Sequence, residues 1–84
     1  MNKRKLFKKL LTGSKNIRFS EATACAESFG FRFDRRNSSH HIYVHPNVPE
    51  LLNLQSVKGK AKPYQVKQLL QLIEQYNLHM GDKE

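Results

Sequence analysis

The hydrophobic positions of this chain repeat with a helical period near both ends and with a period of two in between. Over residues 3–11, apolar side chains recur every three or four positions among lysines, which predicts a short amphipathic helix. Gly13 suits a left-handed position after that helix. A second helix is expected from an N-cap at Ser20 to Gly30. Its narrow apolar stripe consists of Ala22, Cys25, Ala26 and Phe29.

The change to a period of two predicts strands. Phe31 and Phe33 alternate with charged residues in the first strand, and a polar turn leads to a second strand over residues 40–45. A third strand is expected over residues 50–55. Because short turns join these strands, they are expected to pair antiparallel. The residues that share one face of the third strand are Leu52 and Leu54.

The second predicted strand carries most of the histidines. Ile42 and Val44 alternate there with polar rings, so the simplest interpretation buries the two aliphatic side chains and displays the rings. Histidine exchanges protons near neutral pH. A row of displayed rings on a basic protein therefore indicates a site that acts on an anionic ligand. The residues expected on the displayed face are His41, Tyr43 and His45.

The last third of the chain predicts a basic loop over residues 57–62 and then a helix that starts at Pro63. The helical stripe consists of Val66, Leu69, Leu70 and Ile73, extended by Tyr76. The fold class is thus α+β, with the order α-β-β-β-α behind a short N-terminal helix. We expect a three-stranded antiparallel sheet with the helices packed on one face.

The chain of 84 residues is long enough for one domain with a two-layer core. We expect that domain to span residues 1–84. Within it, residues 1–16 form the N-terminal helix and linker, residues 17–78 the core, and residues 79–84 a frayed tail.

Charge and cysteine content narrow the function classes. Lys and Arg number 15 against 7 Asp and Glu, which gives a net charge of +8 and favours a polyanionic partner over a membrane surface. Cys25 is the one cysteine, so an internal disulfide is excluded and a cytoplasmic protein is expected. Lys8 and Lys9 interrupt the first apolar run, which argues against a signal peptide, and no run is long enough for a membrane span.

The histidines of the second strand offer acid–base chemistry. A neutral imidazole can take the proton of an RNA 2′-hydroxyl, and this route needs no metal or other cofactor. The alternative is that His40 caps a turn while His41 and His45 are solvated strand residues. A shared metal is disfavoured, because His41 and His45 stand about 13 Å apart on an extended strand. His79 lies in the tail and receives no role.

Basic residues on either side of the strands are candidates for phosphate contacts. Three lysines precede the last helix, whose free backbone N–H groups favour anions; the alternative is a solvated loop. Arg35 and Arg36 come before the histidine turn and are candidates to clamp a phosphate beside it. Tyr43 either stacks a base or only flanks the sheet. The three lysines are Lys58, Lys60 and Lys62.

These stretches together resemble the HicA toxins of bacterial toxin–antitoxin systems. The resemblance rests on Phe29-Gly30-Phe31, on residues 39–46 and on residues 60–63, and it covers residues 17–78. Ser39 and His40 match the family's Gly-Ser-His hallmark, whereas Ser38 stands where glycine is usual. If the turn needs a positive φ there, the serine is strained, and an ordinary φ would remove the strain.

The resemblance implies a double-stranded-RNA-binding-domain-like fold and a metal-independent endoribonuclease that cuts mRNA and arrests translation. It also implies a HicB-type antitoxin that covers the active site. By position, His40 corresponds to the family's catalytic histidine. Ser39, His41 and His45 match common family residues. The competing interpretation is a non-catalytic RNA-binding module of the same fold. Adjacent titratable rings at His40 and His41 favour the enzyme, because a pure binder gains little from them.

Overall fold

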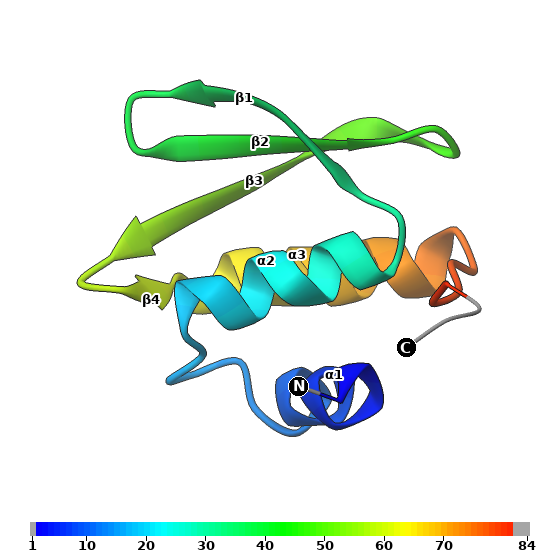
Figure 1. Ribbon diagram of the computed structural model, residues 1–84, viewed down its shortest axis with the longest axis horizontal. Coiled ribbons are helices and arrows are strands. Elements are labelled where there is room, and N and C mark those ends of the chain that lie inside the picture. The colour runs from blue at the N-terminus through cyan, green and yellow to red at the C-terminus, as the bar shows by residue number, and fades with distance from the viewer. Residues whose placement is uncertain (1, 82–84) are drawn as a thin grey trace.

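A computed structural model describes residues 2–81 and confirms the α+β fold with helices on one face of an antiparallel sheet. The sheet has the order β1-β2-β3-β4. In Figure 1, α2 and α3 both lie under the sheet, where each contacts β3, and α1 lies on their far side. The elements are α1 (Lys3–Thr12), α2 (Phe19–Ser28), β1 (Arg32–Asn37), β2 (His40–His45), β3 (Val48–Val57), β4 (Lys60–Ala61) and α3 (Pro63–Gln75).

The helices follow their predicted apolar stripes, but two of the expected caps differ. Gly13 has an extended backbone, with φ −175°, and not the left-handed conformation that was expected after α1. Ser20 is not the N-cap of α2, since that helix begins at Phe19. The reason is Glu21, whose Oε1 accepts the backbone N–H of Arg18 at 2.9 Å and so moves the cap upstream.

One hydrophobic cluster joins α1, α2, α3 and the inner face of the sheet. It includes the predicted stripes of both core helices, apart from Leu70 and Tyr76, which are partly buried and pack against it. Leu52 and Leu54 are fully buried, as their shared face predicted. Cys25 is also fully buried, and burial raises the pKa of its thiol to about 12, so it behaves as a small apolar side chain.

The basic loop predicted over residues 57–62 is a hairpin, which adds a short fourth strand to the expected three. Lys58 and Gly59 form its turn with φ values of 54° and 80°, the pattern of a type I′ turn. Val57 pairs with Lys60 across it. A lysine is an uncommon residue at the first of these positions, and this is why the sequence pattern favoured a loop.

The predicted faces of β2 are reversed in the structure. Tyr43 lies opposite Leu52 and His41 opposite Leu54, and side chains directly opposite each other share a face of the sheet. The rings of His41, Tyr43 and His45 therefore point toward the helices. His40, Ile42 and Val44 lie on the outer face. The prediction was wrong because the leucines of β3, not the aliphatic residues of β2, decide which face is buried.

The C-terminal segment is held more firmly than expected. Tyr76 follows α3 as its C-cap, and its hydroxyl donates to a carboxylate oxygen of Glu50 at 2.5 Å. Gly81 N–H donates to Ser28 O at 3.1 Å, and Met80 packs against the core. The frayed tail predicted from residue 79 is thus wrong as far as Gly81, and residues 82–84 lie outside the described part of the chain.

Candidate active site

The turn between β1 and β2 places the site. Asn37 pairs with His40 in the ladder, so Ser38 and Ser39 form a two-residue turn. Ser38 has φ 59°, the left-handed region, whereas type II′ turns carry glycine at this first central position. Arg36 Nε donates to Ser38 O at 2.9 Å and holds the turn in this shape. Of the two turn conformations considered for Ser38, the structure thus has the one with a positive φ, and the serine backbone is strained there.

The imidazole of His40 is oriented by a residue that the sequence analysis missed. His40 Nδ1 lies 3.1 Å from Asn53 Oδ1. An amide oxygen only accepts, so in the neutral ring Nδ1 carries the proton and Nε2 keeps its lone pair. Asn53 alternates with two buried leucines in β3, and that alternation places it on the outer face. Only the register of β2 against β3 brings it beside His40.

Ser39 is held by a separate hydrogen bond next to His40. Its Oγ accepts from Gln55 Nε2 at 3.0 Å, across the same pair of strands. The backbone N–H of Gln55 in turn donates to Gln65 Oε1 at 2.7 Å. Gln65 comes from the first turn of α3 and is 1% exposed, so a buried amide ties the start of α3 to the strand behind the turn. No pattern in the sequence indicates this contact.

His45 is not brought to His40. Its Nδ1 accepts the backbone N–H of Asn47 at 3.0 Å, so Nε2 carries the proton and donates to Phe29 O at 3.0 Å. Nε2 thus holds the end of α2 against β2, and Nδ1 holds the turn that follows β2. Gly30 fits beside this ring with φ 95°, and a Cβ there would lie 2.9 Å from His45 Nε2. His45 is a structural residue in this geometry.

His41 and Tyr43 also lie on the inner face. His41 packs between Phe19 and Phe33, with ring centroids 4.8 and 6.0 Å away, and its Nδ1 has no hydrogen-bond partner among the described residues. Tyr43 is 5% exposed, and burial raises the pKa of its phenol while a hydrogen bond with Thr23 partly offsets that effect. A buried ring cannot stack on a base, so that predicted role of Tyr43 is wrong. Phe33, half exposed, is the accessible ring nearby.

The two arginines before the turn lie on different faces. Arg35 pairs opposite Ile42 and shares the outer face with His40, while Arg36 pairs opposite His41. A bulge at Asp34 sets this register. Arg35 also forms an ion pair with Asp34, Nη1 to Oδ2. Of these two arginines, Arg35 therefore projects its charge on the face of the candidate catalytic histidine.

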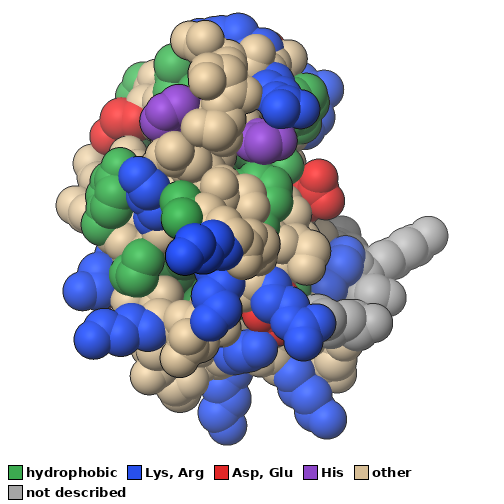
Figure 2. All heavy atoms as spheres, turned by 90° about the vertical axis from the view of Figure 1, so that its left-hand side faces the viewer, with side chains coloured by type: hydrophobic (Ala, Val, Ile, Leu, Met, Phe, Trp, Pro, Cys, Tyr) green, Lys and Arg blue, Asp and Glu red, His purple; other side chains and the backbone are tan. Residues whose placement is uncertain are grey.

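The lysines of the β3–β4 hairpin lie at the same end of the molecule as the β1–β2 turn. Figure 2 faces this end and shows Lys and Arg side chains over its lower half, with histidines above them. Lys58 and Lys60 are exposed, and Lys60 Nζ donates to Asn16 Oδ1 at 2.9 Å. Lys62 is the N-cap residue of α3. The predicted phosphate contacts and His40 thus share one basic end.

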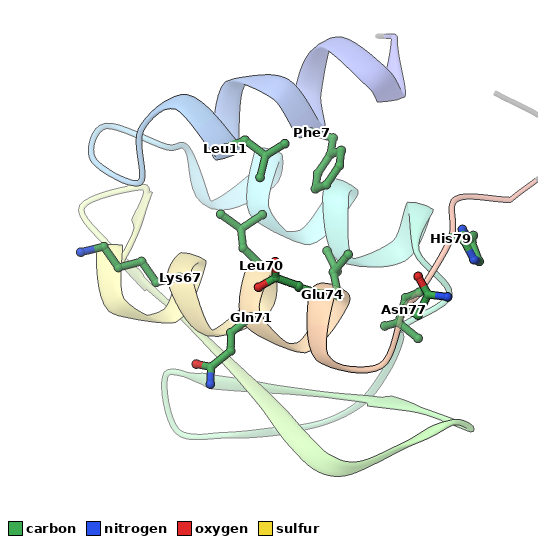
Figure 3. Close-up of a pocket in the computed structure, with 10 residues that line it drawn as sticks. Phe7, Leu11, Lys67, Leu70, Gln71, Glu74, Asn77 and His79 are labelled. Carbon is green, nitrogen blue, oxygen red and sulfur yellow. The ribbon is translucent and has the colours of Figure 1, made fainter.

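A cavity of about 570 Å³ lies elsewhere, between α1 and α3. In Figure 3, Phe7 and Leu11 of α1 point toward Leu70 of α3 across it, and His79 lies at its edge. None of the predicted site residues lines it. Over residues 2–81, the structure also groups no three His, Cys, Asp or Glu side chains that would hold a metal ion.

A family model described as the HicA toxin of bacterial toxin–antitoxin systems matches residues 19–77. This match spans the core helices and the whole sheet, so the chain belongs to the HicA toxin family, as the sequence motifs indicated. A comparison with curated proteins finds no match. None of the helices described here has the length and apolar character needed to cross a bilayer.

Proposed function

We propose that the protein is a metal-independent endoribonuclease that cleaves mRNA and arrests translation, with His40 as the acid–base residue. The observation that carries this proposal is the hydrogen bond from His40 Nδ1–H to Asn53 Oδ1, because it leaves Nε2 free to accept a proton. His40 stands at an exposed turn, on a protein of net charge +8. These features together suit a reaction at the phosphate backbone of RNA.

The proposed reaction is a transesterification. His40 Nε2 takes the proton of a ribose 2′-hydroxyl, the 2′ oxygen forms a bond to the adjacent phosphorus, and the bond from phosphorus to the 5′ oxygen breaks. The leaving 5′ oxygen takes a proton from water, and the hydroxide that remains takes the proton held by His40 Nε2. The products are a 2′,3′-cyclic phosphate and a 5′-hydroxyl. Arg35, on the same face, supplies positive charge as the phosphate gains negative charge.

The remaining candidate residues are assigned to binding and support. Ser39 holds the turn through Gln55, and Arg36 holds it through Ser38 O. The three lysines of the β3–β4 hairpin and the start of α3 bind RNA phosphates next to the turn. His41, Tyr43 and His45 support β2 from the inner face. An antitoxin of the HicB type, present in the cytoplasm with the toxin, is the proposed inhibitory partner. The three lysines assigned to RNA binding are Lys58, Lys60 and Lys62.

The test is cleavage of a single-stranded mRNA fragment by wild type and His40→Ala. A positioned acid–base group contributes about 10²–10⁴ in rate, so His40→Ala should lose that factor while keeping its fold and its RNA affinity. Asn53→Ala should lose less cleavage activity than His40→Ala, because the imidazole is still present and only its orienting hydrogen bond is removed. The double variant should be no slower than His40→Ala, because the two residues act as a unit.

Three outcomes would change the proposal. A folded His40→Ala protein that cleaves at the wild-type rate would remove His40 from the reaction. A wild type that binds RNA tightly without cleaving it would support the non-catalytic RNA-binding module. A loss of cleavage in EDTA that a divalent ion restores would replace the proposed route with a metal-dependent one.

A further inference from the structure

A cavity of about 360 Å³ opens beside the β3–β4 hairpin, and a part of the chain outside the family match lines it. Three lysines surround it, and two apolar side chains form its wall. Within the described chain, no carboxylate lines it. The residues that matter here are Lys15, Lys60 and Lys62 for the charge, and Val57 and Pro63 for the apolar wall.

The linker between α1 and α2 is fixed against the hairpin, and this places Lys15 at the cavity. Ile17 O accepts the N–H of Ala61 at 2.9 Å. Asn16 Oδ1 accepts from Lys60 Nζ at 2.9 Å. Lys15 directly precedes these contacts and its side chain is exposed. Lys15, which lies before the family match, therefore adds a positive charge to a cavity that is otherwise lined mainly by residues of the matched region.

The cavity is close to the candidate catalytic histidine. Gln55 lies opposite His40 in the neighbouring strand, and Val57 follows two residues later on the same face. One strand spacing of about 4.8 Å and two residues of about 3.3 Å each put the two Cα atoms, of His40 and Val57, roughly 8 Å apart. A strand of RNA that places a phosphate at His40 can extend directly into the cavity.

The chemistry of the lining fits a nucleotide better than a bare anion. Clustered ammonium groups without a carboxylate attract phosphate. The side chains of Val57 and Pro63 offer an apolar surface for the flat face of a base or for a ribose, which a free anion would not use. Volume and polarity thus both match one nucleotide unit of an RNA chain.

We infer that this cavity is a subsite for a nucleotide that flanks the cleaved position of single-stranded RNA, and that Lys15 contacts its phosphate. The inference rests on the proposed function. It assigns to the segment before residue 19 a part in substrate binding, and it makes affinity depend on RNA length.

The experiment compares Lys15→Ala with Lys8→Ala, both in a His40→Ala background so that the RNA stays intact. Lys8 lies on the solvent face of α1 and is exposed, so Lys8→Ala removes the same charge from the same segment. Affinity for an eight-nucleotide RNA and for a dinucleotide is measured over a series of salt concentrations. Thermal melts confirm that each variant is folded.

We expect Lys15→Ala to reduce the slope of log affinity against log salt by about 0.7 for the eight-nucleotide RNA, the value for one phosphate contact on a single strand. The dinucleotide should bind equally well to both variants. Equal slopes for Lys15→Ala and Lys8→Ala with the longer RNA would overturn the inference. So would binding of polyglutamate that depends on Lys15 together with RNA binding that does not, since the cavity would then take an acidic peptide.

Failure of this inference is distinct from failure of the proposed function. Cleavage by the wild-type protein depends on His40 whatever Lys15 does. If the wild type cleaves RNA and Lys15→Ala behaves as Lys8→Ala, the subsite alone is rejected. If the wild type neither binds nor cleaves RNA, the proposed function is rejected with it.

Discussion

At the scale of single residues, a few side chains take positions that their type does not favour, and these positions surround the candidate active site. Ser38 holds a left-handed backbone where glycine is the usual residue. His40 depends on an amide from another strand for its tautomer. Strain of this kind persists where the surrounding structure holds it, here through the hydrogen bond from Arg36 to Ser38 O.

The strain at Ser38 has a measurable consequence. Ser38→Gly relieves the cost of the left-handed region, about 1 kcal/mol, although glycine gives back part of this through the larger freedom of its unfolded chain. We expect a small net gain in stability and an unchanged or faster cleavage. Thermal melts and single-turnover cleavage of the two proteins test this. A glycine variant that is both less stable and slower would show that the serine hydroxyl, and not the backbone, matters at this turn.

His45 and Gly30 should affect stability and not chemistry. His45→Ala leaves Phe29 O without its donor, and Gly30→Ala forces a Cβ against the ring and into a left-handed φ. Each change should cost about 1–3 kcal/mol of folding free energy. Urea melts give the cost, and cleavage per folded molecule should stay within a few-fold of wild type. A stable His45→Ala protein with cleavage lost to the level of His40→Ala would instead place His45 in the reaction.

At the scale of elements, α1 is joined to the core partly through one ion pair. Lys9 Nζ lies 2.7 Å from Glu21 Oε2, and the Glu21 carboxylate also accepts the N–H of Arg18. The hydrogen bond from Lys9, and then the one from Arg18, lower the pKa of Glu21 below its ordinary value, with burial opposing them. Glu21 thus caps α2 and anchors α1 at once.

This arrangement predicts a loss of stability in acid. Because the pKa of Glu21 is lower in the folded than in the unfolded protein, its contribution is complete above its ordinary pKa of 4.5 and disappears as the pH falls through the folded value. Melting temperatures from pH 7 to pH 3 should fall more steeply for wild type than for Glu21→Gln. The exposed Glu74→Gln serves as control and should follow the wild-type curve. Parallel curves for wild type and Glu21→Gln would contradict this.

At the scale of the whole molecule, the candidate site and several basic side chains lie at one end of the fold. The β1–β2 turn, the β3–β4 hairpin and the first turns of α2 and α3 all meet at the end that Figure 2 faces. A net charge of +8 spread evenly would attract any polyanion weakly. Under the proposed function, the basic side chains at this end would orient RNA across His40.

The triple variant Lys58→Ala, Lys60→Ala and Lys62→Ala tests this role of the basic side chains. If each lysine contacts a phosphate, the slope of log affinity against log salt should fall by about 2, since a single strand contributes about 0.7 per contact. A control with alanine at Lys5, Lys8 and Lys67 removes the same net charge from other exposed positions. Equal slopes for the two triple variants would mean that the hairpin lysines are only solvated surface.

The sequence by itself determined the three helices, three of the four strands and the family. Periods of 3.6 and 2 report which residues of one element share a face, and those residues formed the core stripes of α2, α3 and β3 as predicted. The motif from Ser39 to Pro46, with the lysines before α3, was enough to identify a HicA toxin, and the match over residues 19–77 confirms it. Such information is local, since each signal lies within about a dozen neighbouring residues.

Only the tertiary structure decided which face of β2 looks inward and what His40 contacts. The pattern within β2 is ambiguous, because rings and aliphatic side chains both bury apolar area, and the choice belongs to the buried leucines opposite. Asn53 and Gln65 stand 13 and 25 positions away from His40 in the chain, and strand register and helix docking alone bring them to the site. Contacts between distant segments depend on how whole elements pack, and no local pattern records that.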